Sequence, residues 1–364
     1  MRRNQIGIDE VVLKDFVVSN IDEERLKGNV NAVCEYMAGS PLKTMQGSGV
    51  RLLRIRDERI GELLLSYTKN NFDTRKEYQM LTKLTMKSSA RANIYNLNAE
   101  QFKARVKQVE SLLNVEYGIR LELEQARISR LELNVNIELK EKYENYSRCI
   151  KLLAQLASMN YRPNVLIDQS KYATWHKVTS EKDSIETMLI KNNAIEFKVY
   201  DKSAELKAND GVGVKRNIMR IEYVFKQPRT IEAWIGRTVA EVTNGGIKSL
   251  FMRYFTRDVV AKVNQWSEDN EKDLLDVVQS HKLNKRTWVN QFIREVRQYE
   301  GKNGLPLLFD LGDMRKVLNR LESTESNNQS HKYKRFEEQC VFEDDLIGHR
   351  ARLEEILTNV ERIG

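Results

Sequence analysis

A tyrosine and two lysines lie close together in the segment IEFKVYDKSAEL, residues 195–206. The alternation of apolar and polar residues predicts a strand here, in which Lys198 and Tyr200 share the polar face. A tyrosine hydroxyl is a good nucleophile only where its surroundings favour the phenolate, because its ordinary pKa is about 10. Positive charge from Lys198 and Lys202 would favour that form. Tyr200 is therefore the candidate nucleophile, and a packed strand aromatic without a chemical role is the alternative.

Two further segments carry an acidic residue on the polar face of a predicted strand. These are Glu132 in RLELNVNIEL, residues 130–139, and Glu222 in RIEYVFK, residues 220–226. Carboxylate and amide oxygens are the ligands that Mg²⁺ and Mn²⁺ prefer. If the two strands are neighbours, Glu132 and Glu222 would hold a divalent cation, with Asn134 as a further ligand. The alternative is a sheet with one solvated face, on which these charges have no partner of their own.

The elements that would position these residues follow from the hydrophobic pattern. Alternating and β-branched patterns predict strands at 6–18, 47–67 (a pair), around 117–124, 127–139, 184–200 (a hairpin) and 217–226. Three- and four-residue spacings predict helices at 98–113, 140–158, 249–266, 271–281, 284–300, 313–322 and about 344–361. Asn98, with Gln101 three residues later, is the expected N-cap of the first of these helices.

The order of these elements predicts an α+β fold. We expect an antiparallel sheet with helices packed on one face, followed by a mostly helical C-terminal region. The expected division is an α+β domain at 1–230, a helical region at 231–321, and a polar linker with a C-terminal helix at 322–364.

The composition limits the class of protein. Among 364 residues, 41% are hydrophobic and 31% charged, which is typical of a folded chain and excludes a disordered one. The net charge of +8 is compatible with a polyanionic partner. Cys34, Cys149 and Cys340 are isolated, so neither a zinc site of the CxxC kind nor a disulfide framework is indicated. A charged start and the lack of a long apolar run predict a cytoplasmic protein with no membrane partner.

Three of these segments resemble, in the same order, motifs of rolling-circle replication initiators of the filamentous-phage gene II/X and plasmid Rep-trans type. SRLELNVNIE is similar to the Ser-Arg-Ile-Asp strand of that family, IEFKVYDKSAEL to its tyrosine–lysine segment, and MRIEYVFK to its Arg-Phe-Glu strand. The resemblance covers about residues 125–230 and implies an HUH-like nuclease core. Glu132 is a departure, since the family often has aspartate at that position.

The resemblance implies a DNA nickase. Tyr200 would cut one strand of single-stranded or supercoiled origin DNA, leaving a 5′-phosphotyrosyl enzyme and a free 3′-hydroxyl primer, with later religation. Glu132 and Glu222 would lie near the Mg²⁺ or Mn²⁺. The wider HUH superfamily uses paired histidines as metal ligands, but this chain has no His-x-His pair. His176 is the histidine whose position lets it serve as a ligand.

The helical part has two interpretations. In residues 274–300 a basic helix follows a short polar turn, which is typical of a helix-turn-helix. Its basic residues Lys285, Arg286, Arg294 and Arg297 would then face phosphate; otherwise they form the solvated side of a helical bundle. The chain has no P-loop, so we expect a host helicase as partner. The rival functions are a non-catalytic origin-binding initiator and a structural protein of an assembly.

Overall fold

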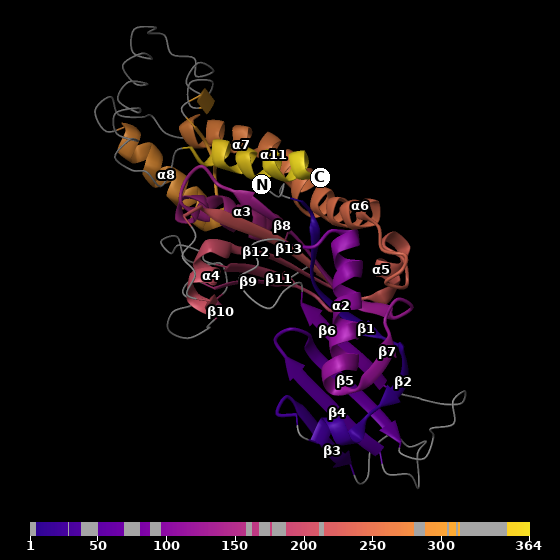
Figure 1. The fold of residues 1–364 in the computed structure, drawn as a ribbon. Helices are drawn as coiled ribbons and strands as arrows, with labels where there is room; N and C mark the ends of the chain where they lie inside the picture. The colour runs from indigo at the N-terminus through magenta and orange to yellow at the C-terminus, as the bar shows by residue number, and fades with distance from the viewer. Residues whose placement is uncertain are drawn as a thin grey trace.

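The computed structural model of the protein describes residues 5–27, 29–37, 50–68, 81–87, 96–157, 162–166, 175–176, 187–210, 215–279, 288–303, 306–310, 312–313 and 348–364. Its main feature is an eleven-stranded sheet in which all neighbouring strands are antiparallel (Figure 1). In sheet order the strands are β10 (Trp175–His176), β9 (Arg162–Leu166), β11 (Thr187–Lys191), β12 (Ile195–Asp201), β13 (Ile218–Phe225), β8 (Arg127–Glu138), β1 (Gly7–Lys14), β6 (Leu81–Lys87), β5 (Gly61–Thr68), β4 (Val50–Asp57) and β3 (Ala32–Met37). The predicted α+β class with an antiparallel sheet is confirmed.

The remaining described elements are a small second sheet and a set of helices. The small sheet pairs β2 (Val17–Ile21) with β7 (Ile119–Glu122). The helices are α1 (Glu23–Lys27), α2 (Ala99–Tyr117), α3 (Ser147–Ala157), α4 (Lys202–Asp210), α5 (Pro228–Trp234), α6 (Asn244–Phe255), α7 (Ala261–Gln279), α8 (Trp288–Asn303) and α11 (His349–Ile363). A 3₁₀ turn, Tyr143–Tyr146, precedes α3, and a π-helical segment, Thr256–Val260, joins α6 to α7.

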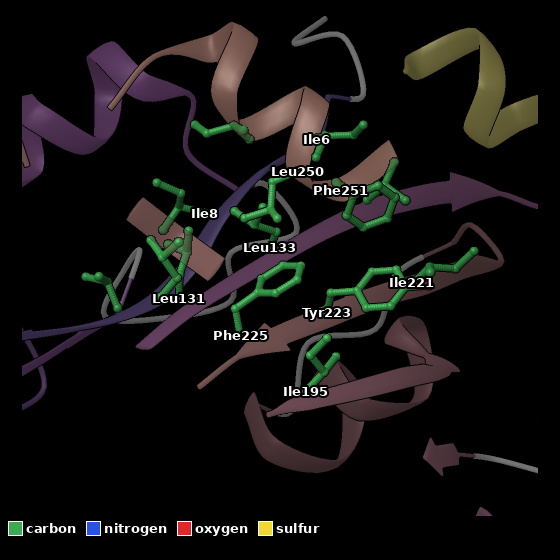
Figure 2. Packing of buried hydrophobic residues seen from close by; sticks show 14 of the residues in the cluster. Ile6, Ile8, Leu131, Leu133, Ile195, Ile221, Tyr223, Phe225, Leu250 and Phe251 are labelled. Atoms are coloured by element: carbon green, nitrogen blue, oxygen red, sulfur yellow. The ribbon is translucent and has the colours of Figure 1, made fainter. Parts of the chain in front are cut away.

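An apolar core lies between one face of the sheet and the helices. Tyr223 of β13 stacks on Phe197 of β12 with ring centroids 4.7 Å apart, and meets the edge of Phe251 of α6 at 5.4 Å. Figure 2 shows Tyr223 and Phe225 on the side of the sheet that α6 covers. Alternation along the strands sends the apolar side chains to this face and leaves the other face to polar ones. The site described below lies on that other face.

Several predicted elements have different limits in the structure. The strand predicted at 6–18 is broken at Asp15, whose φ of 54° lies in the left-handed region. The chain turns there, and β2 leaves the main sheet to pair with β7. The helices predicted at 249–266 and 271–281 form one continuous run as far as Gln279, because residues 267–270 between them lie inside α7.

The predicted helix start at Asn98 is confirmed as a capping box. Asn98 Oδ1 accepts a hydrogen bond from the backbone N–H of Gln101 at 2.8 Å, and Gln101 Oε1 accepts one from the backbone N–H of Asn98 at 3.1 Å. Gly118 ends this helix with a φ of 67°, a conformation that favours glycine.

Some predictions concern residues outside the described part of the chain. The helix at 313–322 and the linker at 322–335 lie there almost entirely, as do Lys285 and Arg286. Arg294 and Arg297 are described, and both are exposed on α8. The division at residues 230 and 321 stays a prediction. None of the described helices combines the length and apolarity needed to cross a bilayer.

An ion-pair cluster ties the β4–β5 hairpin to the C-terminal end of α2. Arg59 donates to the buried carboxylate of Asp57 at 2.7 Å and to Glu116 at 2.6 Å, and the Tyr117 hydroxyl also donates to Asp57 at 2.7 Å. The hydrogen bond from Arg59 lowers the pKa of Asp57 to about 2. Ionised Asp57 is therefore stabilised in the folded state relative to the unfolded one.

We expect Asp57→Asn to lower the free energy of unfolding by roughly 1–2 kcal/mol near pH 7. The folded-state pKa is depressed, so this contribution is full above the unfolded value of 3.8 and fades as the pH falls towards 2. Urea unfolding at pH 7, 5 and 3 measures it. Asp15→Asn, at an exposed carboxylate, is the control and should cost little. An equal loss for Asp57→Asn at pH 3 and pH 7 would show that the contribution is not electrostatic.

Candidate active site and metal centre

The strands β12, β13 and β8 are neighbours in the sheet (Figure 1), and their antiparallel pairing brings polar residues of all three together. The register gives two cross-strand rows, Lys198–Glu222–Asn134 and Tyr200–Arg220–Asn136. Residues directly opposite one another lie on the same face of a sheet with their Cβ atoms about 4.5–5.5 Å apart. The register therefore puts Tyr200, Lys198 and Glu222 on one face, as the alternation in the sequence predicts.

A β-bulge in β1 adds an acidic residue to this face. The register with β8 shifts between Ile8 and Val11, so that β1 has one residue more than its partner there. The bulge contains Asp9. Carboxylate oxygens of Asp9, Glu132 and Glu222 all lie within 4.8 Å of one another. These three residues are called the acidic triad below.

Glu222 connects the acidic triad to the candidate nucleophile. Its side chain is 2% exposed. The Tyr200 hydroxyl donates a hydrogen bond to Glu222 Oε2 at 3.2 Å, and Lys198 Nζ donates to Oε1. Lys198 Nζ also lies 3.9 Å from Glu132 Oε2. The phenol, the ammonium group and two carboxylates therefore form one contiguous polar cluster.

Two arginines complete the charge pattern around the triad. Arg220, almost fully buried, donates through Nη1 to Asp9 Oδ2 at 2.7 Å and through Nε to Asn136 Oδ1 at 2.8 Å. Arg130 pairs with Glu10 and donates to Glu132 Oε2 at 3.3 Å. Arg220 thus holds Asp9 in the triad, and each triad carboxylate has a cationic neighbour among the described residues.

Negative charge nevertheless dominates at the buried carboxylates. Burial raises the pKa of Glu132 well above its ordinary value, and the charge of Glu222 raises it further. Burial alone would lower the pKa of Lys198, but the charges of Glu222 and Glu132 outweigh it and leave that pKa raised. Both shifts have the sign expected for a site that is short of positive charge.

The same environment holds Tyr200 as the neutral phenol. Burial raises its pKa well above 10, and the negative charge of Glu222 adds to the effect, while Arg220 opposes it. Converting this phenol to phenolate therefore requires more positive charge beside Glu222, or a proton acceptor at the hydroxyl. Glu222 already accepts the hydrogen bond from that hydroxyl.

The acidic triad can bind a metal ion. Three carboxylates from three strands offer an all-oxygen donor set, which suits hard divalent cations such as Mg²⁺ and Mn²⁺. A cation there would offset the repulsion between Glu132 and Glu222, which adds to the larger effect of burial in raising the pKa of Glu132. The donor chemistry of the site therefore fits the cation predicted from the sequence.

The other predicted residues lie at different distances from this cluster. Asn134 is fully buried, and its Oδ1 accepts a hydrogen bond from Asn96 Nδ2 at 2.7 Å, so Asn134 is anchored beside Glu222. Lys202 begins α4 and pairs with Glu205, with Nζ 5.9 Å from the centroid of the Tyr200 ring. Its charge therefore lies over the ring, whereas Lys198 lies at the carboxylate. Metal ligation by Asn134 stays a prediction.

His176 is far from the cluster along the sheet. It belongs to β10 at the edge, and β9 and β11 separate that strand from β12. The register runs from His176 through Val165 and Met188 to Val199, so position 176 is in line with Val199 and not with Tyr200. The structure therefore does not bring His176 together with the acidic triad.

Asp9, Arg220 and Asn136 belong to the site but are not among the residues predicted from sequence. Asp9 lies in the strand GIDEVVLK, where an acidic pair interrupts an otherwise apolar pattern. That signal has the same form as the acidic residue in the middle of RLELNVNIEL. The bulge, which decides the face of Asp9, has no signature that alternation could detect.

Comparisons with known proteins add little to this geometry. No family model matches the chain, and no curated protein matches it. A solved structure of the rolling circle replication initiator protein from Geobacillus stearothermophilus aligns with 66% of this chain and 80% of its own, at 11% identity and a TM-score of 0.29. A superposition this loose carries no argument, so the functional inference depends on the residues of this chain.

We expect Mn²⁺ or Mg²⁺ to stabilise the protein through the acidic triad. A ligand that binds only the folded state at about a hundred times its Kd adds about 2.7 kcal/mol to the free energy of unfolding. Thermal unfolding with and without Mn²⁺ measures this. Glu222→Gln should remove most of the increase, because it takes one carboxylate from the triad.

Glu138→Gln is the matched control, since Glu138 lies in β8 but is 55% exposed and pairs with Arg216. It should respond to Mn²⁺ like the wild type. If Glu222→Gln responds like Glu138→Gln, the triad is not the metal site.

Proposed function

We propose that this protein is a rolling-circle replication initiator that nicks one strand of origin DNA with Tyr200 as the nucleophile. The observation that carries the proposal is the 3.2 Å hydrogen bond from the Tyr200 hydroxyl to Glu222, a member of the acidic triad. A nucleophile and a cation site that share one carboxylate can act on the same phosphate group. The resemblance of the three strand motifs to such initiators supports the same assignment.

Tyr200 performs the substitution at phosphorus in this proposal. Its oxygen forms a bond to the phosphorus of the scissile phosphodiester while the bond from phosphorus to the 3′ oxygen breaks. The products are a 5′-phosphotyrosyl enzyme and a 3′-hydroxyl, after the departing oxygen takes a proton from solvent. Attack by the 3′-hydroxyl on the tyrosyl ester reverses the step and reseals the strand.

The neighbouring residues position the tyrosine and accept the proton of its hydroxyl group. Glu222 Oε2 already accepts the hydrogen bond from the phenol, so it is placed to take the proton during attack. Lys198 and Arg220 hold Glu222 and Asp9 in place. A divalent cation bound by the triad would neutralise charge on the non-bridging phosphate oxygens. Strand separation after the nick would require a helicase from the host.

A second function fits one of the same observations. Each triad carboxylate already has a cationic neighbour in Lys198, Arg130 or Arg220, as in a structural ion-pair network. On that basis the protein would be a non-catalytic initiator that only binds origin DNA. The two functions differ in whether a strand is cut and whether protein becomes attached to its 5′ end.

We expect the wild-type protein to convert supercoiled DNA that carries its cognate origin into open circles in Mn²⁺ or Mg²⁺, and to leave it intact in EDTA. Tyr200→Phe should abolish nicking, at least about a thousandfold, because it removes the attacking oxygen. DNA binding, measured by mobility shift, should persist. Gel electrophoresis of the plasmid with and without protease digestion measures both nicking and attachment.

Tyr146→Phe is the matched control. Tyr146 also donates a hydrogen bond through its hydroxyl to a glutamate, Glu355 at 2.8 Å, but it lies in the turn before α3 and not on a strand of the site. This variant should nick at close to the wild-type rate. Nicking that survives in Tyr200→Phe would contradict the proposal, and metal-independent binding without any nick would favour the non-catalytic initiator.

A further inference from the structure

The polar face that holds the acidic triad continues across β1, β6, β5 and β4. Val12 of β1 lies opposite Arg130, which shares the face of Glu132. From β1 the pairing runs through β6 and β5 to β4, with Lys14 opposite Lys83, Lys83 opposite Leu64, and Leu64 opposite Arg54. Figure 1 shows these strands extending from β8 to the end of the sheet away from α8.

Basic positions outnumber acidic ones on this part of the face. The register puts five basic residues there, Lys14, Lys83, Lys87, Arg54 and Arg56. It has three acidic ones, Glu10, Glu62 and Asp9 of the triad, which pairs with Arg220. Glu10 is paired with Arg130. Glu62 lies 3.5 Å from Arg54 and 3.0 Å from Arg56, so one carboxylate serves two guanidinium groups. Positive charge is therefore in excess.

The described basic side chains of this face are open to solvent. In β4 the residues alternate, with Leu53, Ile55 and Asp57 buried and the arginines between them exposed. The side chain of Arg54 is 46% exposed, and that of Arg56 is 71% exposed. Lys14 is exposed as well. These residues contribute little to the core, so their charge is available to a partner.

The distance across this surface suits an extended nucleic acid strand. Neighbouring strands are spaced by about 4.8 Å, so the four steps from β8 to β4 span about 19 Å. The surface begins beside the acidic triad and leads away from it on the same face. A DNA strand whose scissile phosphate lies at Tyr200 would reach this surface with its flanking nucleotides.

We propose that the polar face of β1, β6, β5 and β4 binds the phosphate backbone of single-stranded DNA next to the cleavage point. Lys14, Arg54 and Arg56 are its described contacts. The choice of DNA as the polyanion rests on the proposed function, whereas the excess of positive charge does not. Binding of this kind depends on charge and not on base sequence, because lysine and arginine contact phosphate oxygens.

The test is the affinity for a labelled single-stranded oligonucleotide, measured by fluorescence anisotropy in EDTA, where no cleavage occurs. The triple variant Lys14→Gln, Arg54→Gln, Arg56→Gln should weaken binding about tenfold at low salt. Between about 50 and 200 mM NaCl, the slope of log Kd against log salt should fall by about 2, since each lost phosphate contact in a single strand removes about 0.7.

A matched control removes the same charge elsewhere. Lys107 on α2 and Lys248 and Arg253 on α6 are exposed helix residues, and their triple change to Gln should leave the slope unaltered. A second variant, Glu62→Gln, should tighten binding, because it frees Arg54 and Arg56 from their shared carboxylate. A misfolded protein could not produce that gain.

Three results would overturn the proposal. They are an unchanged affinity and slope in the Lys14, Arg54 and Arg56 variant, an equal loss in the helix control, or a loss confined to duplex DNA. Nicking plays no part in this measurement. If the protein never nicks DNA but the triple variant shows the predicted change in slope, the binding surface is supported and the proposed nicking activity is not. If the protein nicks DNA but the slope does not change, the nicking activity is supported and the binding surface is not.

Discussion

The site depends on holding the Glu222 carboxyl group in a place that water scarcely reaches. Its side chain is 2% exposed, and it lies next to two further carboxylates. Removing a carboxylate from water costs several kcal/mol unless charge and hydrogen bonds replace the lost hydration. Lys198 and Tyr200 provide them at Glu222, and Arg220 provides them at Asp9. The hydrogen bonds that stabilise these buried carboxylates therefore include the one that places the Tyr200 phenol beside them.

The two faces of the sheet have different roles, since one packs into the core and the other carries the site. On one face Tyr223, Phe197 and Phe251 pack into the core that joins the helices to the strands. On the other face the same strands present Glu222 and Tyr200 with their spacing fixed by the backbone ladder. A site built on central strands is held more firmly than one on loops, because each residue is anchored by hydrogen bonds on both sides. The bulge in β1 then adds a third carboxylate without breaking the sheet.

The parts that could be predicted from sequence are those that depend on local pattern. Alternation assigned Tyr200, Lys198, Glu132 and Glu222 to polar faces, and the capping residues located the start of α2 at Asn98. The class of fold followed from the number and order of such patterns.

The rest depends on which strands become neighbours, and local pattern carries no such information. The sequence does not indicate that β1, which ends at Lys14, lies beside β8, which begins at Arg127, so Asp9 is not among the predicted residues. Arg220 is likewise not among the predicted site residues, yet it is almost fully buried and donates hydrogen bonds to Asp9 and Asn136. His176 is the opposite case, a predicted site residue that the fold places away from the site. Its position shortly before the β11–β12 hairpin suggested proximity, but an antiparallel order with β10 at the edge takes it away from Tyr200.

The most direct test of the account is to identify the amino acid that becomes joined to DNA. The wild-type protein is incubated with an oligonucleotide of its origin and Mn²⁺, digested with nuclease and trypsin, and the peptide that retains a 5′-nucleotide is sequenced by mass spectrometry. Cleavage after Lys198 and Lys202 isolates Tyr200 in the peptide of residues 199–202, which contains no other tyrosine. If Tyr200 is the nucleophile, the nucleotide is attached to that peptide. A nucleotide on any other peptide, or a cut strand with no peptide attached, would contradict it.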